Sequence, residues 1–338
     1  MNYTKKYSCL PDEIVTRLSD GASVLFSEEW FNYNTARGEE LCYIWDNRGC
    51  LVIRIKTVMI LKAGILDCEN YMFKDVSEEK QQKFLDDCCE TIRKNKIVDW
   101  IQTEISANFT AHPTNSVVFG SGNYVLTIDD CTDDELFMKM HSKNRNMIRR
   151  GEREGITIAR GRNELVDDYK SLEDQVWGRQ GRAKRSVDHY TEILDNMPTA
   201  SALAVAYNPA GEPEAGTLFL YNKTMAYYHH GASRTNHTIG AHNYLLYQQI
   251  LYMKHLGVKK INFVGYRRKA EQGLNAKADS IQAFKSKFGG EAVETYGFKV
   301  EFSRLKYKLY RIANKYINHD QLMDIYDSRS RNYPEYNK

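Results

Sequence analysis

The chain has 338 residues and a formal net charge of +3, with 42% hydrophobic and 27% charged residues. This length suits roughly two domains of ordinary size, and this composition is typical of a folded protein rather than a disordered one. The small net charge excludes a general nucleic-acid coat, and no apolar run approaches the roughly 18–20 residues that span a bilayer.

The first half of the chain alternates between strand-like and helical patterns. We expect, in order, a short strand running into a helical turn at 22–32, strands at 40–46 and 50–60, a helix at 77–96, a strand at 98–105, a strand region at 117–128 interrupted by Gly120-Ser-Gly122, and a long helix at 132–154. Ser77 and Thr132 are N-capping residues followed by acidic residues. Gly155 ends the long helix, which places a domain boundary near it.

The second half repeats the order of the first. We expect a strand at 156–160, helices at 164–177 and 187–196, strands at 202–207, 215–221 and 225–230, a helix at 242–255, a strand at 260–264, a helix that carries Lys285, a strand at 292–302 and a helix at 305–317. This repeated order indicates an α+β fold made of two copies of one domain. The expected domains are residues 1–154 and 155–327, followed by a polar tail at 328–338.

The cysteines indicate the compartment. All seven lie within the first 131 residues, their number is odd, and no pair has C-x-x-C spacing. These features favour reduced thiols in a cytoplasmic protein over disulfides or a zinc site. The residues after Met1 lead into no apolar core, so we expect no secretion signal.

One stretch of the long helix is strongly basic. Residues 143–162 hold seven basic residues against two acidic ones. Lys143 and Arg150 lie close to one face of the helix, and Arg145 and Arg149 form an adjacent row. These residues form either a phosphate-binding stripe for tRNA, coenzyme A or a nucleotide diphosphate, or a solvated helix face. Both interpretations stay open.

Further segments carry candidate binding and catalytic residues. Arg234 precedes small residues at a helix start, where backbone N–H groups can bind an anion. Tyr228, a candidate substrate contact, and His230 end a strand that points to the same loop. A histidine there can act as general base or simply pack across the strands. Tyr266 and Arg267 either contact phosphates or belong to a solvated loop.

Three segments, taken together, resemble a known family. They are residues 143–156, which begin Lys143-Asn-Arg145; residues 240–263, which begin Gly240-Ala-His242; and the motif Phe284-Lys285-x-x-Phe288-Gly289-Gly290. Their order and spacing resemble the Fem-type transferases, which are peptidoglycan bridge-forming aminoacyltransferases, and related FemAB-like proteins. The resemblance covers roughly residues 130–300.

The resemblance implies two tandem GNAT-like domains, each a mixed, mostly antiparallel sheet flanked by helices. It implies an enzyme that transfers an amino acid from aminoacyl-tRNA to an amine on a peptidoglycan precursor. Relatives in polysaccharide gene clusters are thought to acylate sugar amines. The lysine of the family's F-K-x-x-F-G motif falls on Lys285, with Phe284 beside it, which implies that Lys285 stabilises the tetrahedral oxyanion of acyl transfer.

The chain departs from the larger Fem enzymes, which carry a long helical arm in the second domain. Only about 36 residues separate Arg160 from the strand near Ala202 once ordinary connections are allowed for. The chain therefore resembles the compact, armless members, and tRNA is less firmly implied. We expect an N-acyltransferase with aminoacyl-tRNA or acyl-CoA as donor, no permanently bound cofactor and no metal. The expected acceptor is a nucleotide- or lipid-linked sugar or peptide, with peripheral membrane association left open.

Two alternatives stay open. A coenzyme-A-dependent N-acyltransferase acting on an amino sugar would bind acetyl-CoA, but the loop after Arg234 has one glycine where GNAT enzymes need two small residues at fixed spacing. A non-catalytic RNA-binding or scaffolding protein would bind RNA with strong salt dependence, and the charge of only +3 disfavours it.

Overall fold

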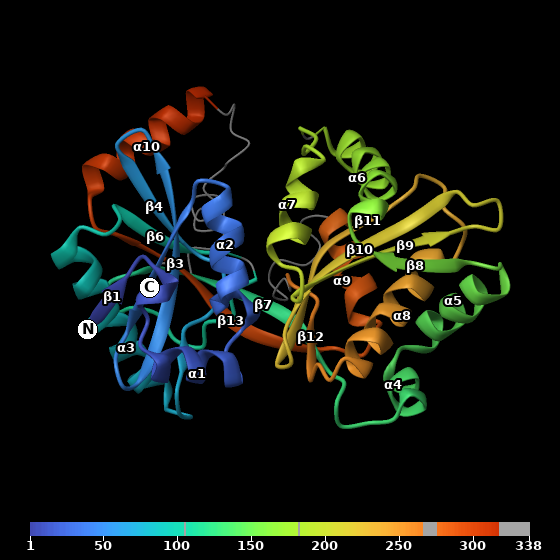
Figure 1. Ribbon diagram of the computed structural model, residues 1–338, viewed down its shortest axis with the longest axis horizontal. Helices are drawn as coiled ribbons and strands as arrows, with labels where there is room; N and C mark the ends of the chain where they lie inside the picture. The colour runs from blue at the N-terminus through green and yellow to red at the C-terminus, as the bar shows by residue number, and fades with distance from the viewer. Residues whose placement is uncertain (105, 182, 266–275, 318–338) are drawn as a thin grey trace. The chain divides into compact units, whose positions relative to one another are not determined.

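The computed structural model describes residues 1–104, 106–181, 183–265 and 276–317. Within these residues the chain forms two compact units (Figure 1). Unit 1 holds Met1–Asn123, Gly265 and the described residues from Val293 onward, and unit 2 holds Tyr124–Val264 and the described residues of the segment that ends at Ala292. Each unit is a mixed sheet with helices packed on it, which confirms the expected α+β class.

Unit 1 is built on a sheet with the strand order β1-β2-β3-β4-β6-β13. Its elements are β1 (Asn2–Thr4), α1 (Asp12–Gly21), α2 (Glu28–Ala36), β2 (Glu40–Trp45), β3 (Gly49–Val58), β4 (Leu61–Leu66), β5 (Tyr71–Met72), α3 (Glu78–Asn95), β6 (Trp100–Thr103) and α10 (Arg304–Ile317), together with most of β13 (Glu291–Glu301) and the first part of β7 (Val117–Thr127). Strands β1 to β4 pair antiparallel, β4 and β6 pair in parallel across α3, and β13 pairs antiparallel with β6.

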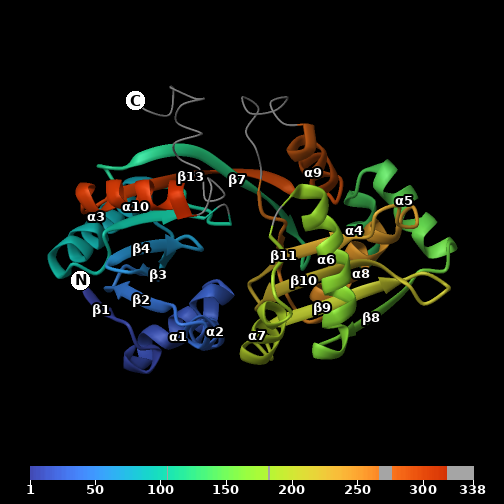
Figure 2. The same cartoon turned by 90° about the horizontal axis from the view of Figure 1, so that it is seen from above.

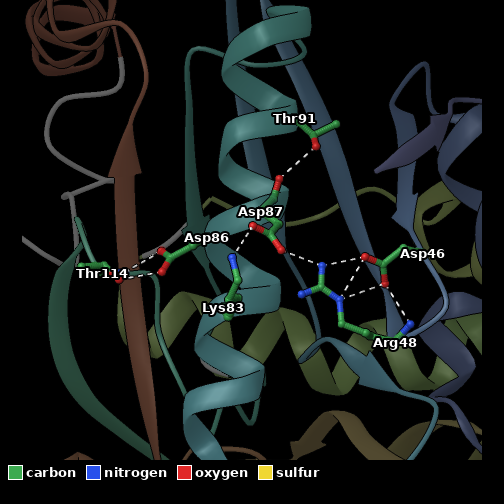
Figure 3. Close-up of polar contacts among 7 residues, drawn as sticks. All are labelled: Asp46, Arg48, Lys83, Asp86, Asp87, Thr91 and Thr114. Atoms are coloured by element: carbon green, nitrogen blue, oxygen red, sulfur yellow. Dashed lines mark hydrogen bonds and ion pairs between the residues drawn. The ribbon is translucent and has the colours of Figure 1, made fainter.

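Helix α3 covers the unit 1 sheet because its apolar side chains recur at helical spacing. Phe84 and Ile92 are fully buried in one cluster with residues of β2 and β3. The helix is also held by charge, since Arg48 in the β2–β3 turn contacts Asp46 at 2.6 Å and Asp87 at 2.7 Å (Figure 3). This ion-pair network ties α3 to the turn.

Unit 2 is built on a sheet with the strand order β7-β12-β11-β10-β9-β8. Its elements are α4 (Asp133–Lys139), α5 (Ser142–Arg153), β8 (Thr157–Gly161), α6 (Val166–Gln180), α7 (Asp188–Asn196), β9 (Ser201–Tyr207), β10 (Pro213–Tyr221), β11 (Met225–Ser233), α8 (Ala241–His255), β12 (Lys260–Asn262) and α9 (Ala276–Ser286), with the last part of β7. Strands β8 to β11 pair antiparallel, β11 and β12 pair in parallel across α8, and β7 pairs antiparallel with β12.

Helices cover both faces of the unit 2 sheet, and small residues on β10 let them approach closely. A Cβ added at Gly216 would stand 2.5 Å from the Tyr169 ring on α6. The preceding residue, Ala215, packs in a cluster with Ala241 and Leu245 of α8. Because successive strand residues point to opposite faces, α6 and α8 lie on opposite sides of β10.

The two units share one topology. Each has an antiparallel meander, then a parallel pair joined through a helix, then a final antiparallel neighbour. That final neighbour is β13 in unit 1, which follows the whole of unit 2 in the chain, and the last part of β7 in unit 2, which directly precedes α4. For this reason no single chain position separates the units. Within the described residues the division falls at 123/124, 264/265 and 292/293, whereas a boundary near 154 was expected, and α4 and α5 lie in unit 2.

The predicted helix at 132–154 is in fact two helices. The expected start is confirmed, because Thr132 and Glu135 form a capping box. The helix stops at Lys139, however, and α5 begins at Ser142, where the His141 side chain accepts the Lys143 N–H and caps the new helix. A polar side chain that bonds to nearby backbone starts a new helix in place of continuing the old one.

Three strand boundaries also differ. Val24–Phe26 form a 3-10 turn and not a strand, because the Ser23 and Ser27 side chains accept backbone N–H groups and cap α2 and the turn before it. The strand expected at 50–60 is the first arm of a hairpin whose second arm, β4, the sequence did not indicate. Strand β7 runs unbroken through Gly120-Ser-Gly122.

Candidate active site

The segments that carry the family-like motifs meet in unit 2. Gly151 on α5 lies so close to Gly240, at the start of α8, that an added Cβ would stand 2.6 Å from the Gly240 carbonyl oxygen. The Lys287 carbonyl, after α9, accepts a hydrogen bond from the His141 N–H before α5, with N···O 3.0 Å. Segments separated by roughly 90 to 150 residues of chain therefore lie close together.

Lys285 lies in the last turn of α9, and its amine contacts the turn after β12. Its Nζ donates a hydrogen bond to the Val264 carbonyl. Val264 has φ +54°, in the left-handed region that favours glycine, and Asn262 Oδ1 holds this turn by accepting the Val264 N–H at 2.8 Å. Burial lowers the pKa of Lys285 to about 8. The amine is therefore mostly protonated at pH 7 although it is poorly solvated.

An aromatic group adjoins Lys285. The Phe284 ring lies 5.1 Å from the His242 ring and 5.2 Å from the Phe288 ring, and His242 Nε2 lies 3.0 Å from the Tyr228 hydroxyl. Burial lowers the pKa of His242 to about 4 and raises the pKa of Tyr228, so both side chains are neutral at pH 7. Because these neighbours are neutral and of low polarity, they screen the charge of the Lys285 ammonium less than water would.

Beside these residues, two neighbouring strands of the unit 2 sheet stop pairing. The described pairing of β11 with β12 ends at Tyr227 and Asn262, while β11 continues to Ser233. On its other edge β11 carries a bulge at His229, because the register with β10 shifts between His230 and Tyr228. Bulges re-aim side chains next to active sites. The Tyr228 hydroxyl and the Val264 turn thus lie where two neighbouring strands part.

His230 lies in a polar cluster with Arg185 and His189. Arg185 Nη1 is 3.3 Å from His230 Nδ1, and His189 Nε2 is 3.4 Å from His230 Nε2. Since arginine only donates, His230 Nδ1 must be the acceptor and the neutral ring carries its proton on Nε2. Burial also lowers the pKa of His230 well below its usual range. The lone pair that a general base needs is occupied, which disfavours that role for His230.

Arg185 itself did not stand out in the sequence. Its guanidinium pairs with the buried Glu173 at 2.9 Å and lies 4.5 Å from the centre of the Trp177 ring. These partners come from α6, some ten residues away along the chain, so no local motif signals them. His242 was also missed as a site residue, although the small residues before it mark the helix start at which it lies.

The basic row on α5 is largely engaged within the protein. Arg145 donates to the backbone carbonyl of Met138 at 3.1 Å, Arg149 lies 5.1 Å from the centre of the Phe137 ring, and Arg150 pairs with Glu154 at 3.3 Å. Lys143 is exposed. The arrangement is closer to a solvated and self-paired helix face than to an open cationic stripe, and phosphate binding by these residues stays a prediction.

The loop at Arg234 already holds an anion from the chain itself. Arg234 pairs with Glu214 and, at 2.7 Å, with Glu212. Glu214 is fully buried and also accepts the Thr238 N–H at 2.5 Å. The donors expected to bind a ligand phosphate are thus used by a carboxylate. Tyr266 and Arg267 lie outside the described residues, and among those described no group of acidic, histidine or cysteine side chains could hold a metal ion.

Comparison with known proteins identifies the family and the fold. The model of the FemAB family matches residues 94–212 and 208–315. FemX superposes with a TM-score of 0.70 at 14% identity, covering 91% of this chain and 99% of that one. No curated protein matches the chain.

Two further solved structures share the architecture. The C-terminal domain of a putative lysylphosphatidylglycerol synthetase from Agrobacterium fabrum has a TM-score of 0.57 at 14% identity, covering 90% of this chain and 96% of that one. A tandem GNAT protein from the clavulanic acid biosynthesis pathway has a TM-score of 0.50 at 11% identity, covering 89% and 98%. The tandem GNAT-like fold is therefore confirmed. Because the family model spans well over half of its residues, the chain belongs to the FemAB family and is an acyltransferase.

Proposed function

We propose that this acyltransferase moves an aminoacyl or acyl group to an amine of a cell-wall or polysaccharide precursor, with Lys285 stabilising the tetrahedral oxyanion. The observation that carries the proposal is the position of the Lys285 amine. It is partly desolvated, it bonds to the Val264 carbonyl at the point where β11 and β12 part, and it lies next to the neutral Phe284–His242 pair. A cation placed where charge develops is worth most in surroundings of low polarity.

In the proposed reaction the acceptor amine attacks the acyl carbonyl of the donor. The new N–C bond forms as the carbonyl π electrons move onto oxygen, and the Lys285 ammonium donates a hydrogen bond to that oxyanion. The intermediate collapses by breaking the bond to the carrier oxygen or sulfur, which takes the proton released by the amine. No histidine base is needed, in line with the occupied lone pair of His230.

The family favours aminoacyl-tRNA as the donor. The buried Glu214 on β10, which pairs with Arg234, disfavours the pyrophosphate of coenzyme A at that loop, because the two anions would repel each other. Acyl-CoA-dependent acylation of an amino sugar remains the second candidate, supported by the shared fold of the tandem GNAT protein. Isothermal titration separates the two: the absence of acetyl-CoA binding at millimolar ligand excludes the second candidate.

The test compares Lys285→Ala with Lys287→Ala, a matched lysine two residues further on. Transfer of a labelled amino acid from tRNA to a nucleotide-linked peptide or amino sugar is measured for each. We expect Lys285→Ala to lose about 10²–10³-fold in turnover with a stability change under about 1 kcal/mol, and Lys287→Ala to match the parent. A Lys285→Ala protein that is folded and fully active would refute the role of Lys285.

A further inference from the structure

One face of α10 is fixed firmly to the unit 1 sheet. Tyr307 is 3% exposed and packs with Trp100 and with Leu61 of β4. The buried Lys299 amine on β13 donates to the Tyr307 hydroxyl at 2.9 Å, and Lys306 pairs with Asp99 at 2.9 Å. Figures 1 and 2 show α10 alongside β4. The helix therefore presents a defined outer face.

That outer face is apolar. Leu305, Leu309 and Ile312 follow one another at i, i+4 and i+7, so they form one stripe, and they are 71%, 48% and 56% exposed. The exposed cations Arg304 and Lys308 lie along one edge of the stripe. Residues 304–317 contain five basic residues and no acidic one. An exposed apolar stripe on a basic helix is typical of a helix that lies in a membrane interface.

The β3–β4 hairpin displays two more large apolar side chains. Met59 is 88% exposed and Ile60 is 73% exposed at its tip. Met59 also has φ +56°, at a position where hairpins use asparagine or glycine. The exposure of both side chains and the left-handed backbone of Met59 do not stabilise the fold, so stability does not explain why these two residues stand at the tip. The next residue, Leu61, packs in the same cluster as Tyr307, so the tip adjoins α10.

We propose that the α10 stripe and the hairpin tip together dock unit 1 onto a membrane surface rich in anionic lipid. The tip and the stripe would enter the boundary between headgroups and acyl chains, while Arg304 and Lys308 contact lipid phosphates. The exposed cations Arg304 and Lys308 beside the apolar stripe favour an anionic lipid surface as the occupant. Among the described helices none could cross a membrane, so the contact is peripheral.

This proposal is independent of the proposed reaction. The test uses the full chain and vesicles of phosphatidylcholine, with and without phosphatidylglycerol, in a co-sedimentation assay. We expect binding to the anionic vesicles that weakens as salt is raised. Met59→Ser combined with Ile60→Ser, and separately Leu305→Gln combined with Leu309→Gln, should each lower the partition coefficient about tenfold or more. The matched control is Met138→Ser, which changes an exposed methionine on α4 of unit 2.

The outcomes are distinct. Because all substituted side chains are exposed, unchanged thermal melts are expected, and binding lost only in the tip and stripe variants supports the proposal. Absence of binding to anionic vesicles by the parent chain, or equal binding by parent and variants, overturns it. A concentration-dependent dimer that disappears in the same variants, measured by sedimentation velocity, also overturns it, because a second copy would then cover this face. Lys285→Ala should bind vesicles like the parent. A negative result in the vesicle assay therefore overturns the membrane proposal and leaves the test of the transfer reaction unaffected.

Discussion

Replacing Lys285 by methionine should separate catalysis from stability. Burial lowers the pKa of Lys285 from 10.5 to about 8, and at about 1.4 kcal/mol per pKa unit this corresponds to about 3 kcal/mol. The folded state binds this proton more weakly than the unfolded chain does. The cost to folding is thus fully present below pH 8 and disappears as pH rises from about 8 towards 10.5. Lys285→Met removes the cost but loses the hydrogen bond to Val264, worth about 1 kcal/mol.

The variant should therefore be up to about 2 kcal/mol more stable than the parent at pH 7, and yet lose about 10²–10³-fold in turnover. Urea unfolding at pH 7 and pH 10 measures the first effect, and the transfer assay measures the second. The rate of the parent should also fall as pH rises through about 8, where Lys285 loses its proton, whereas Lys285→Arg should show no such fall. A parent rate that stays flat between pH 7 and 9, or a Lys285→Met protein that is clearly less stable at pH 7, refutes the reasoning.

Three stability predictions follow from other contacts, each measured by urea unfolding. Gly151→Ala should cost about 1–3 kcal/mol through overpacking against the start of α8, and a neutral result would mean that the helices can move apart. Arg234→Ala should cost about 3 kcal/mol because it leaves the buried Glu214 carboxylate uncompensated, whereas Glu212→Ala, at the exposed partner, should change stability by under about 1 kcal/mol. Arg48→Ala should cost about 1–2 kcal/mol because it frees α3 from the β2–β3 turn, and an equally stable variant would show that apolar packing alone holds α3.

Local signals in the sequence located most helices but could not define every turn. Thr132 and Gly155 mark real helix boundaries, because capping and left-handed backbone conformations act within a few residues. The hairpin at Met59-Ile60 has no turn residue, so strand β4 went unrecognised. The return of β13 to the unit 1 sheet cannot be foreseen from element order, because only long-range pairing with β6 decides which sheet it joins.

The candidate site shows the same division between local and distant information. The motif around Lys285 placed the lysine correctly at a helix end, because helix stops are local signals. What lowers its pKa is burial against a turn some twenty residues earlier, and no spacing rule indicates that contact. For the cationic row on α5 the missing information is the tertiary and local pairing of its side chains. Its charges are visible in the sequence, but the carbonyls, the aromatic ring and the carboxylate that engage Arg145, Arg149 and Arg150 are a matter of tertiary or local pairing.

The buried Glu214 bears on how this enzyme distinguishes acyl carriers. Its carboxylate already satisfies Arg234 and the Thr238 N–H, so a carrier phosphate entering the loop would have to displace a buried charge that has no access to water. Displacing such a buried charge from its partners costs several kcal/mol, more than one charge-assisted hydrogen bond returns. A carrier that needs a pyrophosphate at this helix start is therefore selected against. In the proposed reaction, a carrier that presents its ester to Lys285 from elsewhere along β11 and β12 meets no such barrier, and on this ground we propose aminoacyl-tRNA in place of coenzyme A as the donor.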